Sequence, residues 1–192
     1  MRPACEAVVV GASAGGVEAL LTVFGNLPPA FELPVVVVLH LPERRPSELP
    51  MVLERRLRRP VQEARDKAPV ERGLIYVAGP SYHLSIERDR SFSLSLEPRV
   101  HFSRPSIDLL FDSAADAYGP ALTGVLMTGA SEDGARGLAA IRQAGGRTVV
   151  QDPAEAKIAT MPEAALALFR PDHILTLHGI GKLLADLETG TC

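Results

Sequence analysis

Three residues that can act together in acyl transfer stand beside glycines or at strand ends in the sequence. Ser13 lies within Gly11–Gly15, which fits the G-x-S-x-G pattern of a nucleophile elbow. In such an elbow a sharp turn from strand to helix exposes the serine hydroxyl, and N–H groups at the start of the helix can stabilise an oxyanion. His40 and Asp133 are the candidates for the general base and for the acid that orients it.

The same glycine-rich turn could instead bind a nucleotide phosphate at the start of the helix. The dinucleotide-binding pattern G-x-G-x-x-G, however, requires glycine where Ser13 stands. It also requires an acidic residue at the end of the second strand, where the sequence has His40. The lysine of a P-loop is absent from the turn as well. The sequence therefore disfavours a nucleotide-binding domain.

The residues alone leave the base and the acid open. A histidine at the end of a strand is often structural, and His101 is the strongest rival to His40 among the other histidines, which we expect on the surface or in packing. Asp133 could simply cap the helix that follows it. Asp108 and Asp152 are alternative acids, and Asp152 also follows a strand. Spacing does not decide between these assignments.

Strands and helices alternate along the chain, which predicts the scaffold that positions these residues. Apolar runs predict strands at residues 7–10, 34–39, 61–64, 74–77, 121–127, 148–150 and 174–177. Helices are expected at residues 17–27, 47–58, 106–118 and 135–144, and from Pro162 onward. Alternating residues at 83–86 and 92–96 predict one inserted antiparallel hairpin. The expected fold class is α/β, a doubly wound, mainly parallel sheet with helices on both faces.

The candidate residues follow different strands of this sheet. Ser13 follows the first strand, His40 the second, and Asp133 the strand that ends near Met127. Ligands of an open α/β sheet bind outside the carboxyl ends of its strands. The three side chains are therefore expected at one edge of the sheet, where a Ser-His-Asp hydrolase site could form.

The composition is that of a globular protein and excludes several other functions. With 46% hydrophobic and 22% charged residues, the chain of 192 residues is expected to form one domain. A net charge of -3 gives no indication of a nucleic-acid partner or an anionic membrane. Cys5 and Cys192 fit neither a metal site nor a disulfide framework. Without a recognisable signal peptide or membrane span, we expect a cytoplasmic protein with no membrane insertion.

Several motifs, in order along the chain, resemble the catalytic domain of the chemotaxis response-regulator methylesterases, the CheB family. The resemblance extends from Val8 to about Leu187 and rests on residues 11–16, 40–42, 104–108, 126–135, 144–146 and 161–162. It implies that Ser13 is the nucleophile, His40 the base and Asp133 the orienting acid. It also implies that the backbone N–H groups of Ala130 and Ala14 stabilise the oxyanion.

The resemblance further implies hydrolysis of glutamate γ-methyl esters on the cytoplasmic helices of methyl-accepting chemoreceptors, with glutamine amidase as a further activity. It implies no metal and no organic cofactor. The alternatives are an esterase for a different methylated signalling protein and a non-catalytic interaction module of the same fold. The family often carries an N-terminal receiver domain. Because the first strand begins so close to Met1, we expect residues 1–192 to form one catalytic domain with no receiver domain.

Four positions depart from the pattern of the family. Ala14 stands where threonine is usual and Leu39 where glutamine is usual, so each lacks a polar group that could support the site. Glu132 replaces asparagine and adds a negative charge beside Asp133. Ala130 replaces methionine, but a backbone donor does not depend on its side chain. We expect activity to survive these changes.

Overall fold

One parallel sheet forms the centre of the computed structural model, which describes residues 3–40 and 48–188. Its strands are β1 (Ala7–Ala12), β2 (Val35–Leu39), β3 (Val61–Glu63), β4 (Ile75–Val77), β7 (Leu122–Leu126), β8 (Arg147–Gln151) and β9 (His173–Leu175). They lie in the order β3-β4-β2-β1-β7-β8-β9, and every neighbouring pair is parallel. The remaining strands, β5 (His83–Ile86) and β6 (Phe92–Ser95), form a separate antiparallel hairpin.

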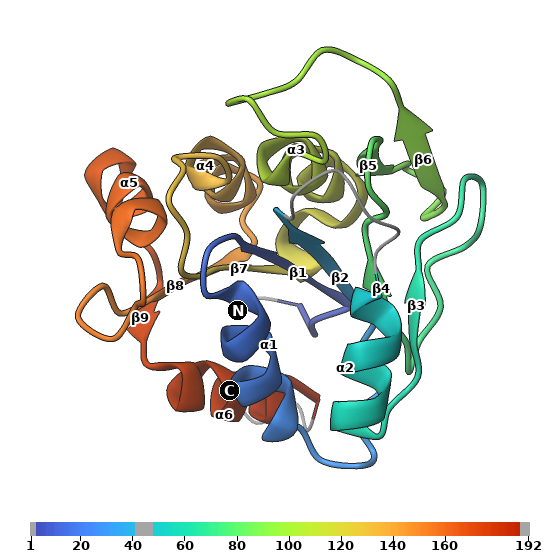
Figure 1. The fold of residues 1–192 in the computed structure, drawn as a ribbon, viewed down its shortest axis with the longest axis horizontal. Coiled ribbons are helices and arrows are strands. Elements are labelled where there is room, and N and C mark those ends of the chain that lie inside the picture. Colours follow the sequence, from blue (N-terminus) through green and yellow to red (C-terminus); the bar gives the residue numbers. More distant parts are fainter. Residues whose placement is uncertain (1–2, 41–47, 189–192) are drawn as a thin grey trace.

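Helices cover both faces of the sheet. They are α1 (Gly16–Gly25), α2 (Leu49–Leu57), α3 (Ile107–Tyr118), α4 (Ala135–Gln143), α5 (Thr160–Leu168) and α6 (Leu177–Glu188), with a short 3-10 helix at Gly119–Ala121. Helices α3, α4 and α5 lie on one side of the sheet, and α1, α2 and α6 lie on the other (Figure 1). The α/β class, the parallel sheet and the inserted hairpin predicted from the sequence are confirmed. No helix of the described residues is both long and apolar enough to cross a bilayer.

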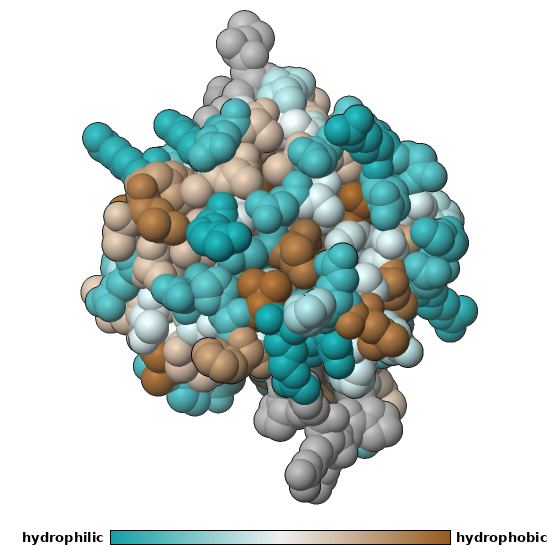
Figure 2. Space-filling model, turned by 90° about the horizontal axis from the view of Figure 1, so that it is seen from above, coloured by the Kyte–Doolittle hydropathy of each residue, from teal (hydrophilic) through white to brown (hydrophobic). Residues whose placement is uncertain are grey.

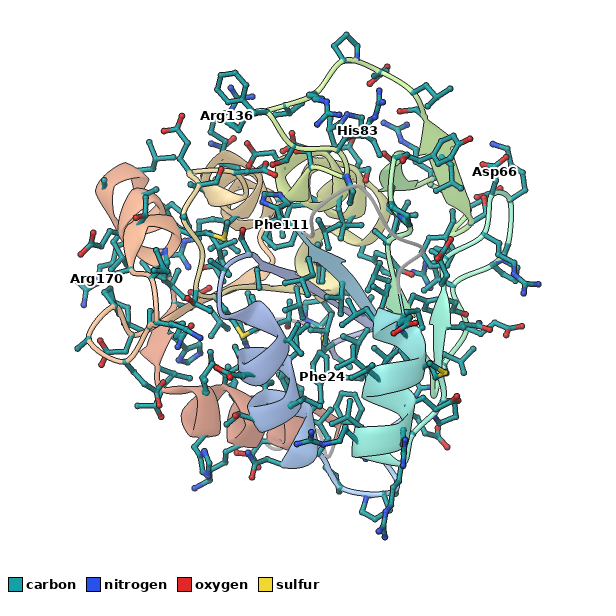
Figure 3. All side chains as sticks on the ribbon, viewed as in Figure 1. Phe24, Asp66, His83, Phe111, Arg136 and Arg170 are labelled. Carbon is teal, nitrogen blue, oxygen red and sulfur yellow. The ribbon has the colours of Figure 1, made fainter. Side chains whose placement is uncertain are left out.

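The apolar strands explain this three-layer arrangement. Val8–Val10 and Val35–Val38 have no exposed surface, because their side chains point alternately into the two helical layers. Phe111 belongs to the core beneath α3, and Phe24 belongs to the core beneath α1 (Figure 3). Burial of an aromatic ring of this size stabilises the fold by roughly 1.5–3 kcal/mol. The two cores together hold the sheet in place as the platform for the site.

The order of the strands creates a switch point at the centre of the sheet. Strand β1 pairs with β2 on one side and with β7 on the other. The chain winds outward from β1 toward β3 first and later from β7 toward β9. Carboxyl ends of strands at such a switch point form the usual binding crevice of a doubly wound sheet.

The C-terminal helix α6 is the element that the sequence analysis did not predict. We expected a strand at residues 174–177, whereas β9 ends at Leu175 and α6 begins at Leu177. Glycines at 179 and 181 lower the intrinsic helix propensity of this segment. Packing compensates for this, since a Cβ at Gly181 would lie 2.7 Å from the carbonyl oxygen of Val23 in α1. Close contact between α6 and α1 therefore depends on glycine.

Candidate active site

Backbone hydrogen bonds join the carboxyl ends of three strands into one edge. The N–H of His40, just after β2, donates to the carbonyl of Ala12 at 3.1 Å. The N–H of Ser13, just after β1, donates to the carbonyl of Thr128 at 2.9 Å. Ser13, His40 and the segment that follows β7 therefore begin from adjacent points of the sheet.

Ser13 lies in the turn between β1 and α1, and this turn requires glycine. Gly15, the residue before α1, has a φ of 82°, a left-handed conformation that side chains disfavour. A Cβ at this position would also lie 2.9 Å from two carbons of Lys157. The carbonyl of Ser13 accepts a hydrogen bond from the N–H of Gly16 at 2.8 Å, which closes the turn. The half-buried Ser13 is thus placed directly before the N-terminus of a helix.

The segment after β7 passes close beside Ser13. A Cβ at Gly129 would lie 2.9 Å from the Cβ of Ser13 and 2.6 Å from the methyl carbon of Met161. A larger residue at Gly129 would therefore push the segment away from the serine. The N–H groups of Ala14 and Ala130, which lie in exposed residues, make no hydrogen bond to the described part of the chain. They can donate to an oxygen bound next to Ser13.

Thr128 connects the serine turn to the neighbouring loop, a role that the sequence analysis missed. Its hydroxyl donates to the carbonyl of Ala14 at 2.8 Å and accepts from the N–H of Ile158 at 3.0 Å. Its own N–H donates to the side-chain oxygen of Gln151 at 2.8 Å. Both Thr128 and Gln151 are buried, so these bonds stiffen the floor of the site.

His40 and Asp133 are joined by a short hydrogen bond. The distance between His40 Nε2 and Asp133 Oδ2 is 2.8 Å, and the side chain of Asp133 is fully buried. The carboxyl group accepts three further hydrogen bonds from the start of α3. These come from the hydroxyl of Ser106 at 2.8 Å, the N–H of Ile107 at 2.7 Å and the N–H of Asp108 at 3.0 Å.

These hydrogen bonds decide the charge of Asp133. Burial by itself raises the pKa of this carboxyl, but the bonds from His40, from two backbone N–H groups and from Ser106 outweigh burial and lower the pKa below its ordinary value. Asp133 is therefore ionised at neutral pH. Because a carboxylate can only accept, Nε2 of His40 carries the hydrogen, and Nδ1 is the nitrogen left to accept a proton.

The structure does not form every contact of a triad. Nδ1 of His40 lies 3.4 Å from the hydroxyl of Ser103, a residue that the sequence analysis did not single out. Within the described residues, the hydroxyl of Ser13 makes no hydrogen bond to His40. Contacts between a nucleophile and its base are often long in the free enzyme and tighten when substrate binds.

The rival histidine and one rival acid form a separate pair next to the site. The nitrogens of His101 lie 3.5 Å from Oδ2 of Asp108 and 3.1 Å from Oε1 of Glu132. The other oxygen of Asp108 accepts the N–H groups of Gly134 and Gly137, at 2.9 and 2.7 Å, at the start of α4. The carboxyl group of Glu132, next to Asp133 in the sequence, thus contacts His101.

Asp152, the other rival acid, lies in a tight turn after β8. Its side-chain oxygen accepts the N–H of Ala154 at 2.9 Å, and its carbonyl accepts the N–H of Glu155 at 3.0 Å. These bonds stabilise the loop after β8. Among the three aspartates, Asp133 is the one that contacts His40.

The chemical capacity of this edge is that of acyl transfer. It combines a hydroxyl before a helix N-terminus, an imidazole whose tautomer is set by a buried carboxylate, and exposed backbone N–H groups beside the hydroxyl. An imidazole in this state can take a proton from an attacking hydroxyl and return it to a leaving group.

Comparison with known proteins agrees with this chemistry. A family model described as CheB methylesterase matches residues 8–184. A protein of Leptospira interrogans, provisionally named a protein-glutamate methylesterase/protein-glutamine glutaminase, is 45% identical over 183 residues and matches over 95% of both chains. A Pseudomonas aeruginosa protein with the same two activities in its name is 38% identical over 180 residues, which cover 94% of this chain but 54% of that relative.

A solved structure has the same fold over nearly the whole length. The crystal structure of the Thermotoga maritima CheB methylesterase catalytic domain superposes with a TM-score of 0.90 at 29% identity. The match covers 96% of this chain and 100% of the other. The layers, the central sheet and the hairpin are therefore shared with a known catalytic domain.

Proposed function

Since the chain belongs to the CheB methylesterase family, we propose that it is a serine hydrolase that removes methyl esters from glutamate side chains on the cytoplasmic helices of chemoreceptors. The observation that carries this proposal is the 2.8 Å hydrogen bond between His40 and the ionised Asp133, at the strand edge that also presents Ser13. A non-catalytic module would have no need for a buried carboxylate aimed at an imidazole.

Acylation uses the tautomer of His40 that Asp133 sets. The oxygen of Ser13 attacks the carbonyl carbon of the glutamyl ester, and Nδ1 of His40 accepts the hydroxyl proton. Asp133 stabilises the resulting imidazolium through Nε2. The N–H groups of Ala14 and Ala130 donate to the oxyanion of the tetrahedral intermediate. When the intermediate collapses, His40 returns the proton to the methoxide, and methanol leaves.

Deacylation repeats the same steps with water as the nucleophile. His40 accepts a proton from the attacking water, and the tetrahedral intermediate again places its oxyanion against the two backbone donors. Collapse releases the oxygen of Ser13, which recovers its proton from His40. The product is a glutamic acid side chain, which loses its remaining proton to solvent at neutral pH. His40 carries the transferred proton in both half-reactions.

A second activity, hydrolysis of a glutamine side chain, follows from the names of the relatives, which join methylesterase with glutaminase. Both reactions attack the same γ-carbonyl, and only the leaving group differs. Ammonia needs a proton more strongly than methanol does, so His40 as general acid is more important for the amide. We propose that amide hydrolysis is the slower of the two reactions.

The test is methanol release from a methylated chemoreceptor by the wild-type protein and by Ser13→Ala. We expect the variant to lose activity by about 10⁴-fold or more, because the nucleophile is missing. The matched control is Ser93→Ala, which removes another half-buried hydroxyl from β6 and should keep full activity. Fluorophosphonate labelling of the wild type but not of Ser13→Ala would separate an enzyme from a binding module. Full methanol release by Ser13→Ala, or none by the wild type, contradicts the proposal.

A further inference from the structure

A tight turn that the catalytic mechanism does not use lies in the long segment between β6 and α3, which arches over the top of the molecule (Figure 1). Val100 and Ser103 exchange two backbone hydrogen bonds, at 2.8 and 3.1 Å. The two residues between them, His101 and Phe102, have φ angles of 48° and 63°. Two consecutive positive φ angles are the pattern of a type I′ turn, which normally contains glycine or asparagine.

Phe102 is an unusual residue for this position. Its side chain is 94% exposed, far more than those of Leu96 at 64% and Met51 at 61%. A large side chain at positive φ is strained, and an exposed aromatic ring gains nothing from burial in the fold. Strain of this kind persists where the surroundings enforce it, which is common at functional sites.

The neighbours of Phe102 enforce the turn from both sides. His101 lies between two carboxyl groups, with Nδ1 3.1 Å from Oε1 of Glu132 and Nε2 3.5 Å from Oδ2 of Asp108. The guanidinium of Arg104 donates to the carbonyls of residues 96 and 97, at 3.2 Å each. These contacts keep the turn in one conformation, so that the ring at its tip can bind without a large loss of entropy.

The turn also reaches the catalytic base. Ser103, the residue after Phe102, has its hydroxyl 3.4 Å from Nδ1 of His40, the nitrogen that accepts the proton in the proposed reaction. Consecutive Cα atoms are about 3.8 Å apart. The turn that carries Phe102 therefore lies beside His40, where the reacting group of a substrate must bind.

The surface around the turn is mixed in polarity. Seen from above, apolar residues on this face occur as small separate groups among hydrophilic ones (Figure 2). A protein that binds to such a face contacts a few apolar side chains within a polar rim, which is usual for transient protein interfaces.

We propose that the turn Val100–Ser103 docks the protein substrate, with Phe102 as the apolar anchor that packs against the helix carrying the reactive glutamyl ester. This inference rests on the proposed function, because it takes a chemoreceptor helix as the occupant. On a helix, side chains three and four positions from the ester lie on the same face and project toward the same surface. Apolar side chains at those positions meet the ring of Phe102 when the ester reaches His40.

The test compares a protein substrate with a small one. Phe102→Asn removes the ring but suits the left-handed conformation, so the turn is preserved. We expect the KM for methylated chemoreceptor to rise by about tenfold, the value for losing one buried apolar anchor. Hydrolysis of p-nitrophenyl acetate, which is too small to contact the anchor and the base together, should stay within about twofold of wild type. Thermal stability should be unchanged or higher, because the strain is relieved.

Two further variants complete the design. Leu168→Asn removes a 57% exposed apolar side chain from α5 and should leave both activities unchanged. Phe102→Tyr keeps the ring and should restore most of the affinity for the receptor. A wild-type KM for receptor in Phe102→Asn overturns the proposal, and so does an equal loss on both substrates, which would mean that Phe102 shapes the site. If wild type cleaves the small ester but releases no methanol from receptor, the proposed function itself fails, together with the receptor helix as occupant.

Discussion

Two buried aspartates at the starts of neighbouring helices each accept hydrogen bonds from the start of the other helix, yet their pKa values move in opposite directions. Asp133 lies just before α4, yet its carboxylate accepts N–H groups from the first turn of α3. Asp108 lies in the first turn of α3, yet its carboxyl accepts the N–H groups of Gly134 and Gly137 at the start of α4. Each helix thus supplies the acid that caps the other, where the partial positive charge of a helix N-terminus favours an anion.

The two carboxyl groups differ in the number of hydrogen bonds that their oxygen atoms accept. Each oxygen of Asp133 accepts two hydrogen bonds, and Oδ2 includes His40 among its donors. Oδ2 of Asp108 is buried and has no hydrogen bond within the described residues, with Nε2 of His101 at 3.5 Å. Burial, aided by the negative charge of Asp133, therefore raises the pKa of Asp108, although two backbone N–H groups oppose the rise. The pKa of Asp133 is lowered.

The comparison shows that donor number, rather than burial, decides the direction in which the pKa of each acid moves. Both aspartates are almost inaccessible to solvent, at 0% and 2% exposure for Asp133 and Asp108. Asp133 accepts hydrogen bonds on both of its oxygens, so its ionised form is favoured, and it is the aspartate that contacts the imidazole of His40.

Asp133→Asn should have the largest effect. An amide in place of the carboxylate puts an NH₂ group against a donor and favours the wrong tautomer of His40, so we expect kcat to fall by about 10⁴-fold. The free energy of unfolding should fall by about 1–3 kcal/mol, because a buried donor loses its acceptor. Ester hydrolysis and urea denaturation measure the two effects. Asp152→Asn, in the turn after β8, is the control and should be active; an active Asp133→Asn would remove this acid from the mechanism.

Ser106→Ala removes one donor from Asp133 without touching His40. The hydroxyl of Ser106 donates to Asp133 at 2.8 Å and accepts the N–H of Leu109 at 3.5 Å as the N-cap of α3. We expect the free energy of unfolding to fall by about 1 kcal/mol and kcat to fall roughly threefold, as the pKa of Asp133 returns toward its ordinary value.

The control for Ser106→Ala lies on the same helix. The hydroxyl of Ser113 accepts the N–H of Ile86 at 3.1 Å and donates to carbonyls of its own helix, whereas no hydrogen bond of the described residues joins it to Asp108 or Asp133. Ser113→Ala should therefore lower stability with kcat unchanged. An equal fall of kcat in both variants would show that Ser106 acts through general stability instead of through Asp133.

Asp108→Asn should change the pH dependence of stability. Because the pKa of Asp108 is raised in the folded state, the native protein binds more protons than the unfolded chain above the ordinary value of 3.8, and stability falls as pH rises through this range. Removal of this group should therefore raise the free energy of unfolding relative to wild type, and this gain should grow as the pH rises above 3.8. Urea denaturation across that range measures the difference.

Asp133 has the opposite sign and provides the comparison. Its pKa is lowered in the folded state, so its stabilisation is present above 3.8 and is lost as the pH falls through the folded pKa. Asp108→Asn should retain this acid-side loss, since Asp133 is intact. A stability difference between Asp108→Asn and wild type that does not grow with pH would show that the two acids do not differ in the way described.

Glu132→Gln should have the smallest effect. The side chain of Glu132 is 69% exposed and lies 3.1 Å from Nδ1 of His101, and even a fully charged surface pair would contribute only about 0–1 kcal/mol. We expect stability, kcat and the pH profile of ester hydrolysis to remain close to wild type. A shift of the pH profile by this variant would mean that the charge of Glu132 acts on His40 rather than on His101.

The sequence predicted those parts of the fold that depend on local pattern. Uninterrupted valine runs indicated buried strands, and the alternation around residues 83–96 indicated the hairpin. Helix α6 was not predicted, because glycines 179 and 181 interrupt the helical pattern of apolar residues and lower the helix propensity. Its stability comes from packing against α1. Local preference extends over a few residues, so it misses elements that depend on distant contacts.

The residues of the candidate site also fall into those that local sequence predicted and those that depend on distant contacts. A strand, a glycine turn and a helix placed Ser13 from sequence alone, because each depends on adjacent residues. The partner of His40 could not be chosen among three aspartates from spacing, since His40 and Asp133 are 93 positions apart. Ser106 and Thr128 lie within the motifs of the family resemblance, but their contacts with Asp133 and with the serine turn were not predicted. Ser103 gave no signal, because a serine is ordinary in any loop. Only the strand order and the crossed capping of α3 and α4 decide which side chains meet, since hydrogen bonds depend on distances that folding alone creates.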